Sequence, residues 1–182
     1  ACYDDPDTVH MVLDKVTAFL IRYCEAYRDA GANGVLMAEP LAGLLSPDLA
    51  GEFSCTYVKK IVDAVQTDDF AVVYHNGGNA VNRMIPEILS TGCVAYHFGN
   101  AIDLRDVLPQ IPADRVCMGN VDPAGEFRNG TPESIREATL RVMGACCQYP
   151  NFVISSGCDI PPMSAWKNID SFFAAVNEFY QA

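Results

Sequence analysis

A glutamate, a histidine and a cysteine each stand just after a separate apolar run of this sequence, as Glu39, His75 and Cys158. The apolar runs cover residues 35–38, 70–74 and 152–154. Short apolar runs bounded by turn residues are typical of buried strands, and parallel strands place their carboxyl ends on one rim of the sheet. Carboxylate, imidazole and thiolate groups all bind metal ions. The pattern therefore predicts a metal site in which the thiol is a working ligand.

Each of the three residues also has an ordinary structural role open to it. A histidine at a strand end can hydrogen-bond to the backbone, and a cysteine can pack as a small apolar residue. A glutamate followed by proline, as in Glu39–Pro40, can cap a loop. The metal site is predicted from the joint occurrence of the three residues at three strand ends.

Three further polar residues end predicted strands and are candidates for catalysis. His97 could act as an acid, a base or a substrate contact, or it could be a rim histidine satisfied by neighbouring groups. Asn120 and Asp122 could bind substrate or orient a ligand. Their segment, Gly-Asn-Val-Asp-Pro at 119–123, is also ordinary turn chemistry that closes a strand.

The segments that must position these residues alternate between strand and helix patterns. Strands are expected at 35–38, 70–74, 94–98, 116–118 and 152–154. Helices are expected at 9–30, 46–65 and 81–89, from Asp103 over a short stretch, at 131–147 and at 164–180. His10, in the first of these helices, is expected to be exposed. Caps support two of the helix starts, because Thr131 precedes Pro132 and Asp103 precedes an apolar turn.

Strict alternation of strands and helices predicts right-handed βαβ units and a parallel sheet of about five strands. Five units are too few to close an eight-stranded barrel. We therefore expect residues 1–182 to form a single α/β domain that is an open sheet or part of a barrel. The chain also begins with a helix that has no strand before it, and we expect further βα units on its N-terminal side.

The composition of the chain excludes some classes of binding partner and indicates the compartment in which the protein works. Lys plus Arg is 12 and Asp plus Glu is 23, so the net charge is −11. This acidic balance argues against nucleic acid and against an anionic membrane surface as partners. Most of the eight cysteines lie in apolar runs and none forms a C-x-x-C pair, which favours free thiols in a reducing cytoplasm.

Several short segments together resemble the C-terminal half of the uroporphyrinogen decarboxylase superfamily, in its cobalamin-dependent methyltransferase branch. They are Gly-Ala-Asn-Gly at 31–34, Leu-Leu-Ser-Pro at 44–47, Gly-Asn-Val-Asp-Pro at 119–123, Gly157-Cys158, Pro162 and Asn168-Ile169. The resemblance implies a (β/α)8 TIM-type barrel of roughly twice this length, of which this chain would be the C-terminal part.

In that branch, zinc is held by a His-x-Cys pair at one strand end and a cysteine at the last. The resemblance places His75 and Cys158 in this role, whereas Gly77 stands where the middle cysteine is expected. Glu39 could supply an oxygen ligand instead, giving three protein ligands and one open position, as in catalytic zinc. The implied activity is methyl transfer between a corrinoid on a partner protein and a small-molecule donor or acceptor.

Two other functions stay open. The superfamily also contains tetrapyrrole decarboxylases, although a substrate with several carboxylates needs a basic cleft and the strand-end loops here hold few cations. The chain could instead be a non-catalytic partial barrel used for binding or assembly. In either case the apolar strands and open sheet edges predict that another chain covers them, most simply as a homo-oligomer.

Overall fold

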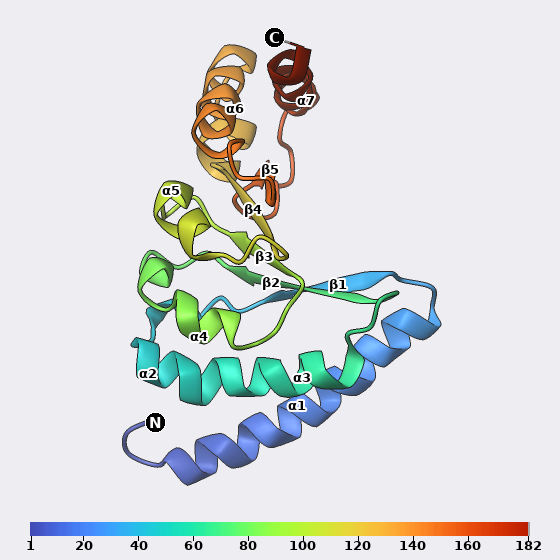
Figure 1. Cartoon of the computed structure of the whole chain (residues 1–182), viewed down its shortest axis with the longest axis vertical. Helices are drawn as coiled ribbons and strands as arrows, with labels where there is room; N and C mark the ends of the chain where they lie inside the picture. The colour runs from blue at the N-terminus through green and yellow to red at the C-terminus, as the bar shows by residue number, and fades with distance from the viewer. Residues whose placement is uncertain (182) are drawn as a thin grey trace. The chain divides into compact units, whose positions relative to one another are not determined.

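The computed structural model describes residues 1–181 as strands and helices in alternation (Figure 1). The strands are β1 (Gly34–Ala38), β2 (Ala71–Asn76), β3 (Ala95–Phe98), β4 (Val116–Val121) and β5 (Phe152–Ser156). The helices are α1 (Pro6–Asp29), α2 (Pro47–Ala50), α3 (Thr56–Val65), α4 (Ile85–Leu89), α5 (Leu104–Val107), α6 (Pro132–Cys146) and α7 (Trp166–Gln181).

The strands form one five-stranded sheet in the order β1-β2-β3-β4-β5, so neighbours in the sheet are also neighbours in the chain. β1 pairs in parallel with β2, and β4 pairs in parallel with β5. The predicted α/β fold, a partial TIM-type barrel with about five parallel strands, is confirmed. No helix within residues 1–181 is long and apolar enough to cross a membrane.

Contacts divide the chain into two compact units, with the boundary inside β3 after Tyr96. The first unit contains β1, β2 and the helices α1 to α4, and the second contains β4, β5 and the helices α5 to α7.

Two strands are longer than their apolar runs. β2 continues through His75 to Asn76, and β4 continues through Asn120 to Val121, because the ladder with the neighbouring strand extends over these polar residues. His75 and Asn120 therefore lie inside strands and not after them. The predicted helix 81–89 begins only at Ile85, because Pro86 starts a new helix after a 3-10 turn at Val81–Arg83.

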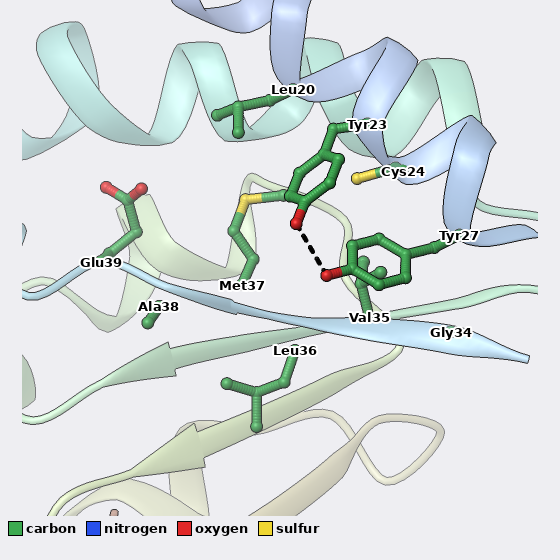
Figure 2. Close-up of a pocket in the computed structure, with 10 residues that line it drawn as sticks. All are labelled: Leu20, Tyr23, Cys24, Tyr27, Gly34, Val35, Leu36, Met37, Ala38 and Glu39. Atoms are coloured by element: carbon green, nitrogen blue, oxygen red, sulfur yellow. Dashed lines mark hydrogen bonds between the residues drawn. The ribbon is translucent and has the colours of Figure 1, made fainter. Parts of the chain in front are cut away.

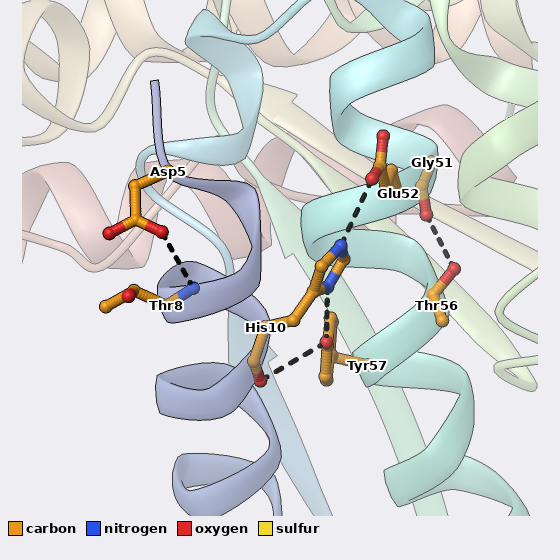
Figure 3. Close-up of polar contacts among 7 residues, drawn as sticks. All are labelled: Asp5, Thr8, His10, Gly51, Glu52, Thr56 and Tyr57. Atoms are coloured by element: carbon orange, nitrogen blue, oxygen red, sulfur yellow. Dashed lines mark hydrogen bonds and ion pairs between the residues drawn. The ribbon is translucent and has the colours of Figure 1, made fainter. Parts of the chain in front are cut away.

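In the first unit, α1 packs along α3 through polar as well as apolar contacts (Figure 3). His10 was expected to be exposed, but it is half-buried and reaches from α1 to the segment before and within α3. Its Nδ1 lies 2.7 Å from the Tyr57 hydroxyl and its Nε2 lies 3.1 Å from Oε1 of Glu52. The ring also stacks on Phe53 at a centroid distance of 4.7 Å. The helical period alone could not reveal this contact, which depends on a second helix.

The connection from α2 to α3 contains a π-helical turn, Gly51–Cys55. This turn buries Phe53, Ser54 and Cys55. The π-turn matters for the candidate site, because Ser54 is one of its residues.

In the second unit, α6 and α7 pack together over a buried cluster. Its members are Val121, Phe127, Ile135, Ala138 and Phe172. The start of α6 is fixed by a capping box between Thr131 and Ser134, in which each side chain bonds to the backbone of the other. Asn168 of α7 donates to the carbonyl of Gly130 at 2.9 Å, which ties α7 to the turn before α6.

Candidate functional site

The carboxyl ends of β1 and β2 lie side by side in the first unit and carry two of the predicted metal ligands. The register pairs Ala38 with His75, and the backbone N–H of Glu39 donates to the carbonyl of His75 at 2.9 Å. The parallel ladder therefore brings Glu39 and His75 together at the level of the backbone, as the two strand-end positions predict.

The side chains of these two residues leave the sheet on opposite faces. Figure 2 shows Met37 and Glu39 on the α1 side of β1, and Leu36 and Ala38 on the other side. Side chains alternate along a strand, and paired residues of parallel strands point to the same face. His75 therefore shares the face of Ala38, opposite to Glu39.

The carboxyl of Glu39 lies in the layer between the sheet and the helices. The hydroxyl of Ser54 donates to its Oε2 at 2.6 Å. Burial raises the pKa of the Glu39 carboxyl above its ordinary value, and the bond from Ser54 opposes this rise. The neighbouring thiol of Cys55 has its pKa raised to about 12 by burial and by the charge of Glu39. To bind a metal ion, Glu39 would have to give up its hydrogen bond from Ser54.

His75 is 7% exposed and lies near the glycine that replaces the expected middle cysteine. A Cβ atom built on Gly77 would lie 4.0 Å from Nε2 of His75, an ordinary contact that needs no shift of neighbouring atoms. A side chain at position 77 would therefore project beside the imidazole. Two side chains that bind the same metal ion must lie next to each other in this way.

Two glycines shape the rim next to His75. A Cβ on Gly43 would meet the Cα of Gly78 at 2.6 Å, and a Cβ on Gly78 would meet the Cα of Gly43 at 2.5 Å. Only glycine at both positions lets the loops after β1 and β2 touch. Asn76 holds the second loop, because its Oδ1 accepts the backbone N–H of Gly78 at 2.9 Å and its amide donates to Tyr74 at 3.0 Å.

In the second unit, His97 is buried and joins the end of β3 to the end of β5. Its Nε2 lies 2.7 Å from the carbonyl oxygen of Ser156 and 3.3 Å from the hydroxyl of Ser155. A carbonyl only accepts, so the tautomer that satisfies the shorter contact carries its proton on Nε2. In that tautomer His97 holds in place the segment that leads to Cys158.

Asn120 and Asp122 both hold backbone groups. The amide of Asn120 donates to the carbonyls of Gly99 and Ile102 at 3.1 and 2.8 Å. One oxygen of Asp122 accepts the backbone N–H groups of Ala124 and Gly125 at 2.9 and 2.8 Å, which is the turn chemistry expected before Pro123. A catalytic role for His97, Asn120 and Asp122 stays a prediction.

Cys158 is exposed in the second unit, and the hydroxyl of Ser156 donates to its carbonyl at 2.7 Å. Across residues 1–181, no group of three or more His, Cys, Asp and Glu side chains is gathered as a metal ion would require. The donor types of His75 and Cys158 suit zinc, whereas Glu39 is engaged by Ser54. The residues thus fit zinc only in part, and the ligand set Glu39, His75 and Cys158 stays a prediction.

Two serines that the motif analysis did not single out partner the candidate residues. Ser54 bonds to Glu39, and Ser155 contacts His97. Ser155 could have been found, because it is a polar residue that directly follows an apolar strand run. Ser54 could not, because its position depends on the π-turn that brings it under β1.

A family model described as uroporphyrinogen decarboxylase (URO-D) matches residues 1–179. The uroporphyrinogen decarboxylase of Pseudoalteromonas translucida (strain TAC 125) is 30% identical over 183 residues, covering 97% of this chain and 50% of that protein. The enzyme of the same name from Chlorobium luteolum is 35% identical over 144 residues, covering 78% of this chain and 40% of that protein. The chain spans about half the length of the curated relatives it matches.

Among solved structures, a methyltransferase from Methanosarcina mazei matches with a TM-score of 0.80 and 25% sequence identity. The match covers 92% of this chain and 48% of the methyltransferase. Sequence relatives named as decarboxylases and a structural relative named as a methyltransferase thus share this fold.

Proposed function

The chain belongs to the uroporphyrinogen decarboxylase family, and from this premise we propose that it is part of a methyltransferase that moves a methyl group between a corrinoid protein and a small substrate. The likeness to the Methanosarcina mazei methyltransferase is the observation that carries the proposal.

The charge of the strand-end loops supports methyl transfer over decarboxylation. Residues 39–46, 77–84, 99–103, 122–131 and 157–165, which follow the five strands, contain two cations, Arg83 and Arg128. A tetrapyrrole acid brings several carboxylates that need cationic partners, whereas a methyl group on a corrinoid or a small neutral donor does not. Strand-end loops with so few cations therefore suit the methyltransferase better.

Zinc is part of this proposal, with His75 and Cys158 as its ligands. When bound, zinc would supply a Lewis acid that lowers the pKa of a substrate thiol or polarises an ether oxygen. The chain's own contribution is to hold the imidazole of His75 at the rim and, through His97, to hold the end of β5 before Cys158. Glu39 would join as a third ligand only after leaving Ser54.

Tetrapyrrole decarboxylation is the second candidate, because the curated relatives described above carry the name uroporphyrinogen decarboxylase. This alternative needs a basic cleft. Since the segments after the five strands supply only Arg83 and Arg128, further cations would have to come from elsewhere in the protein.

Methylcobalamin tests the proposal, because it stands in for the methylated corrinoid of a partner protein. The protein is supplied with zinc and a small thiol, and loss of the methyl–cobalt absorption band is followed. We expect demethylation by the protein and its loss in the His75→Ala variant. The Cys147→Ser variant, changed in the turn after α6, is the control that should keep the activity. A folded, zinc-supplied protein that never demethylates methylcobalamin would favour the decarboxylase or a non-catalytic binding module.

A further inference from the structure

A pocket of about 320 Å³ lies in the second unit, between the start of α5 and the last turns of α6. The side chains that define its chemistry are Asp103, Leu104, Arg105, Asn120, Arg141 and Val142. Neither His97 nor Cys158 lines this pocket. Its volume is at the lower end of the range of small-molecule sites, so the pocket suits a small ligand.

Arg105 is held at the pocket by the carboxylate of Asp103. Its Nε donates to the two carboxylate oxygens at 3.0 and 2.9 Å, and its Nη2 donates to Oδ2. The hydrogen bond from Arg105 lowers the pKa of the Asp103 carboxyl, so this carboxyl is charged at neutral pH. The pair is therefore electrically neutral, and it leaves Nη1 of Arg105 to donate to a ligand.

Arg141 supplies a positive charge that no neighbouring carboxylate balances. Its side chain is exposed on α6, and within residues 1–181 its guanidinium has no hydrogen-bond or ion-pair partner. Two guanidinium groups and one carboxylate give the lining one net positive charge. Because the whole chain carries a net charge of −11, this local charge departs from the general balance and favours an anion with a single charge.

Most of the remaining lining is apolar. Leu104 of α5 and Val142 and Ala145 of α6 contribute alkyl groups. Cys146 also lines the pocket, although it is only 2% exposed. Burial, and after it the charge of Asp103, raises the pKa of this thiol to about 11, so it is neutral at physiological pH. A ligand of this pocket therefore needs an apolar part beside its anionic group.

Asn120 fixes the loop that leads into α5. Its amide donates to the carbonyls of Gly99 and Ile102 at 3.1 and 2.8 Å. Asp103 follows this loop directly and caps α5 by accepting the backbone N–H of Arg105. The pocket is therefore shaped before a ligand binds, and binding does not have to order the loop.

We propose that this pocket binds a small monocarboxylate with a short apolar chain. The carboxylate accepts from Arg141 and from Nη1 of Arg105, and the chain packs on Leu104 and Val142. At about 30 Å³ for each water-sized group, the pocket holds roughly ten such groups, which is enough for a carboxylate with a chain of several carbon atoms. Inorganic phosphate fits less well, because its second negative charge would face Asp103 without a cation to pair with.

Binding at this pocket requires neither a metal ion nor a corrinoid, so it is independent of the proposed methyl transfer. Isothermal titration calorimetry with sodium hexanoate measures it. Hexanoate should bind about tenfold or more tightly than acetate, which lacks the chain, and than hexanol, which lacks the charge. Arg141→Gln should raise the dissociation constant for hexanoate about tenfold. Arg22→Gln, changed at an exposed arginine of α1, is the matched control and should leave that constant unchanged.

A filled pocket tests the shape of the site separately from its charge. Ala145→Leu keeps both arginines but occupies the pocket, and it should also raise the dissociation constant for hexanoate about tenfold or more. Ala18→Leu, at an exposed position of α1, makes the same replacement elsewhere and should change nothing. Far-UV circular dichroism confirms that each variant is folded.

Three results would overturn the proposal. The first is hexanoate that does not bind, or that binds no more tightly than hexanol or inorganic phosphate. The second is an equal effect of Arg141→Gln and Arg22→Gln, which would mean that hexanoate responds only to the overall charge. The third is an unchanged affinity in folded Ala145→Leu, which would place hexanoate outside the pocket.

Discussion

The carboxyl of Glu39 is a half-buried acid next to the rim of the first unit, and its surroundings make stability depend on pH. Burial raises the pKa of this carboxyl above its ordinary value of 4.5, so the folded state holds its proton more tightly than the unfolded state. The stabilising contribution is fully present below pH 4.5 and is lost as the pH rises through the raised pKa. The Ser54 hydroxyl limits the rise but does not reverse it.

We expect the Glu39→Gln variant to lose this pH dependence, because a glutamine side chain does not titrate. Denaturant unfolding at a series of pH values measures the free energy of unfolding of both proteins. Going from below pH 4.5 to neutral pH, the wild-type protein should lose stability relative to Glu39→Gln. A difference between the two proteins that stays constant across this range would contradict the assignment.

Gly77 is the position where a single substitution should create a stronger metal site. In the Gly77→Cys variant the new Cβ meets Nε2 of His75 at about 4.0 Å without a clash, so a thiolate can share a metal ion with the imidazole. We expect zinc affinity to rise about tenfold or more, measured by competition with a chromogenic chelator.

The Gly144→Cys variant is the control for Gly77→Cys. It adds a thiol on α6 at a position where a Cβ has no neighbour within 4 Å. If this variant raises zinc affinity as much as Gly77→Cys does, then an added thiol and not its place beside His75 is responsible.

Cys158 is the thiol of this chain that we expect to bind zinc. Replacing it by serine should weaken zinc binding, because a neutral hydroxyl is a far poorer ligand than a thiolate. Equilibrium dialysis followed by elemental analysis gives the zinc content of the variant. The Cys146→Ser and Cys147→Ser proteins, changed at the end of α6, should bind zinc like the wild type. Unchanged zinc content in Cys158→Ser would remove this residue from the site.

The types of the rim residues could be predicted from the sequence, but the faces they occupy could not. Glu39, His75 and Asn120 stand at or near strand ends as their apolar runs indicate. Whether two such side chains meet depends on the pairing register, and a shift of one residue moves a side chain to the opposite face. The register between β1 and β2 is set by contacts distant in sequence, and the sequence alone does not reveal it. We therefore expect from the sequence that Glu39 and His75 point together, whereas in the structure they point to opposite faces.

At the scale of the elements, helix starts followed local signals closely. Asp103 caps α5 by accepting the backbone N–H of Arg105, and Thr131 caps α6 directly before Pro132. A cap acts within four residues, so a single sequence carries all the information it needs. Strand ends behave differently, because β2 and β4 continue over polar residues only where a partner strand supplies hydrogen bonds.

The capping box of α6 gives a stability prediction at this scale. Thr131→Ala removes the oxygen that accepts the backbone N–H of Ser134, and we expect it to lower the free energy of unfolding by about 1 kcal/mol. Denaturant unfolding followed by circular dichroism measures the change. Thr8→Ala, at an exposed threonine of α1, is the comparison that should change stability by much less. Equal losses in both variants would mean that the cap contributes nothing beyond helix propensity.

At the scale of the whole molecule, the alternation of strands and helices was sufficient to predict the parallel sheet and its strand order. The two compact units were not visible in the sequence, because the boundary falls inside β3 with no linker or change of composition.

The central claim is that this member of the uroporphyrinogen decarboxylase family transfers methyl groups. One preparation of the zinc-supplied protein is given methylcobalamin with a small thiol in one reaction and uroporphyrinogen in another, and both products are measured. We expect a methylated thiol and demethylated cobalamin in the first reaction, and no carbon dioxide in the second. Carbon dioxide release from uroporphyrinogen, with methylcobalamin left intact, would contradict it.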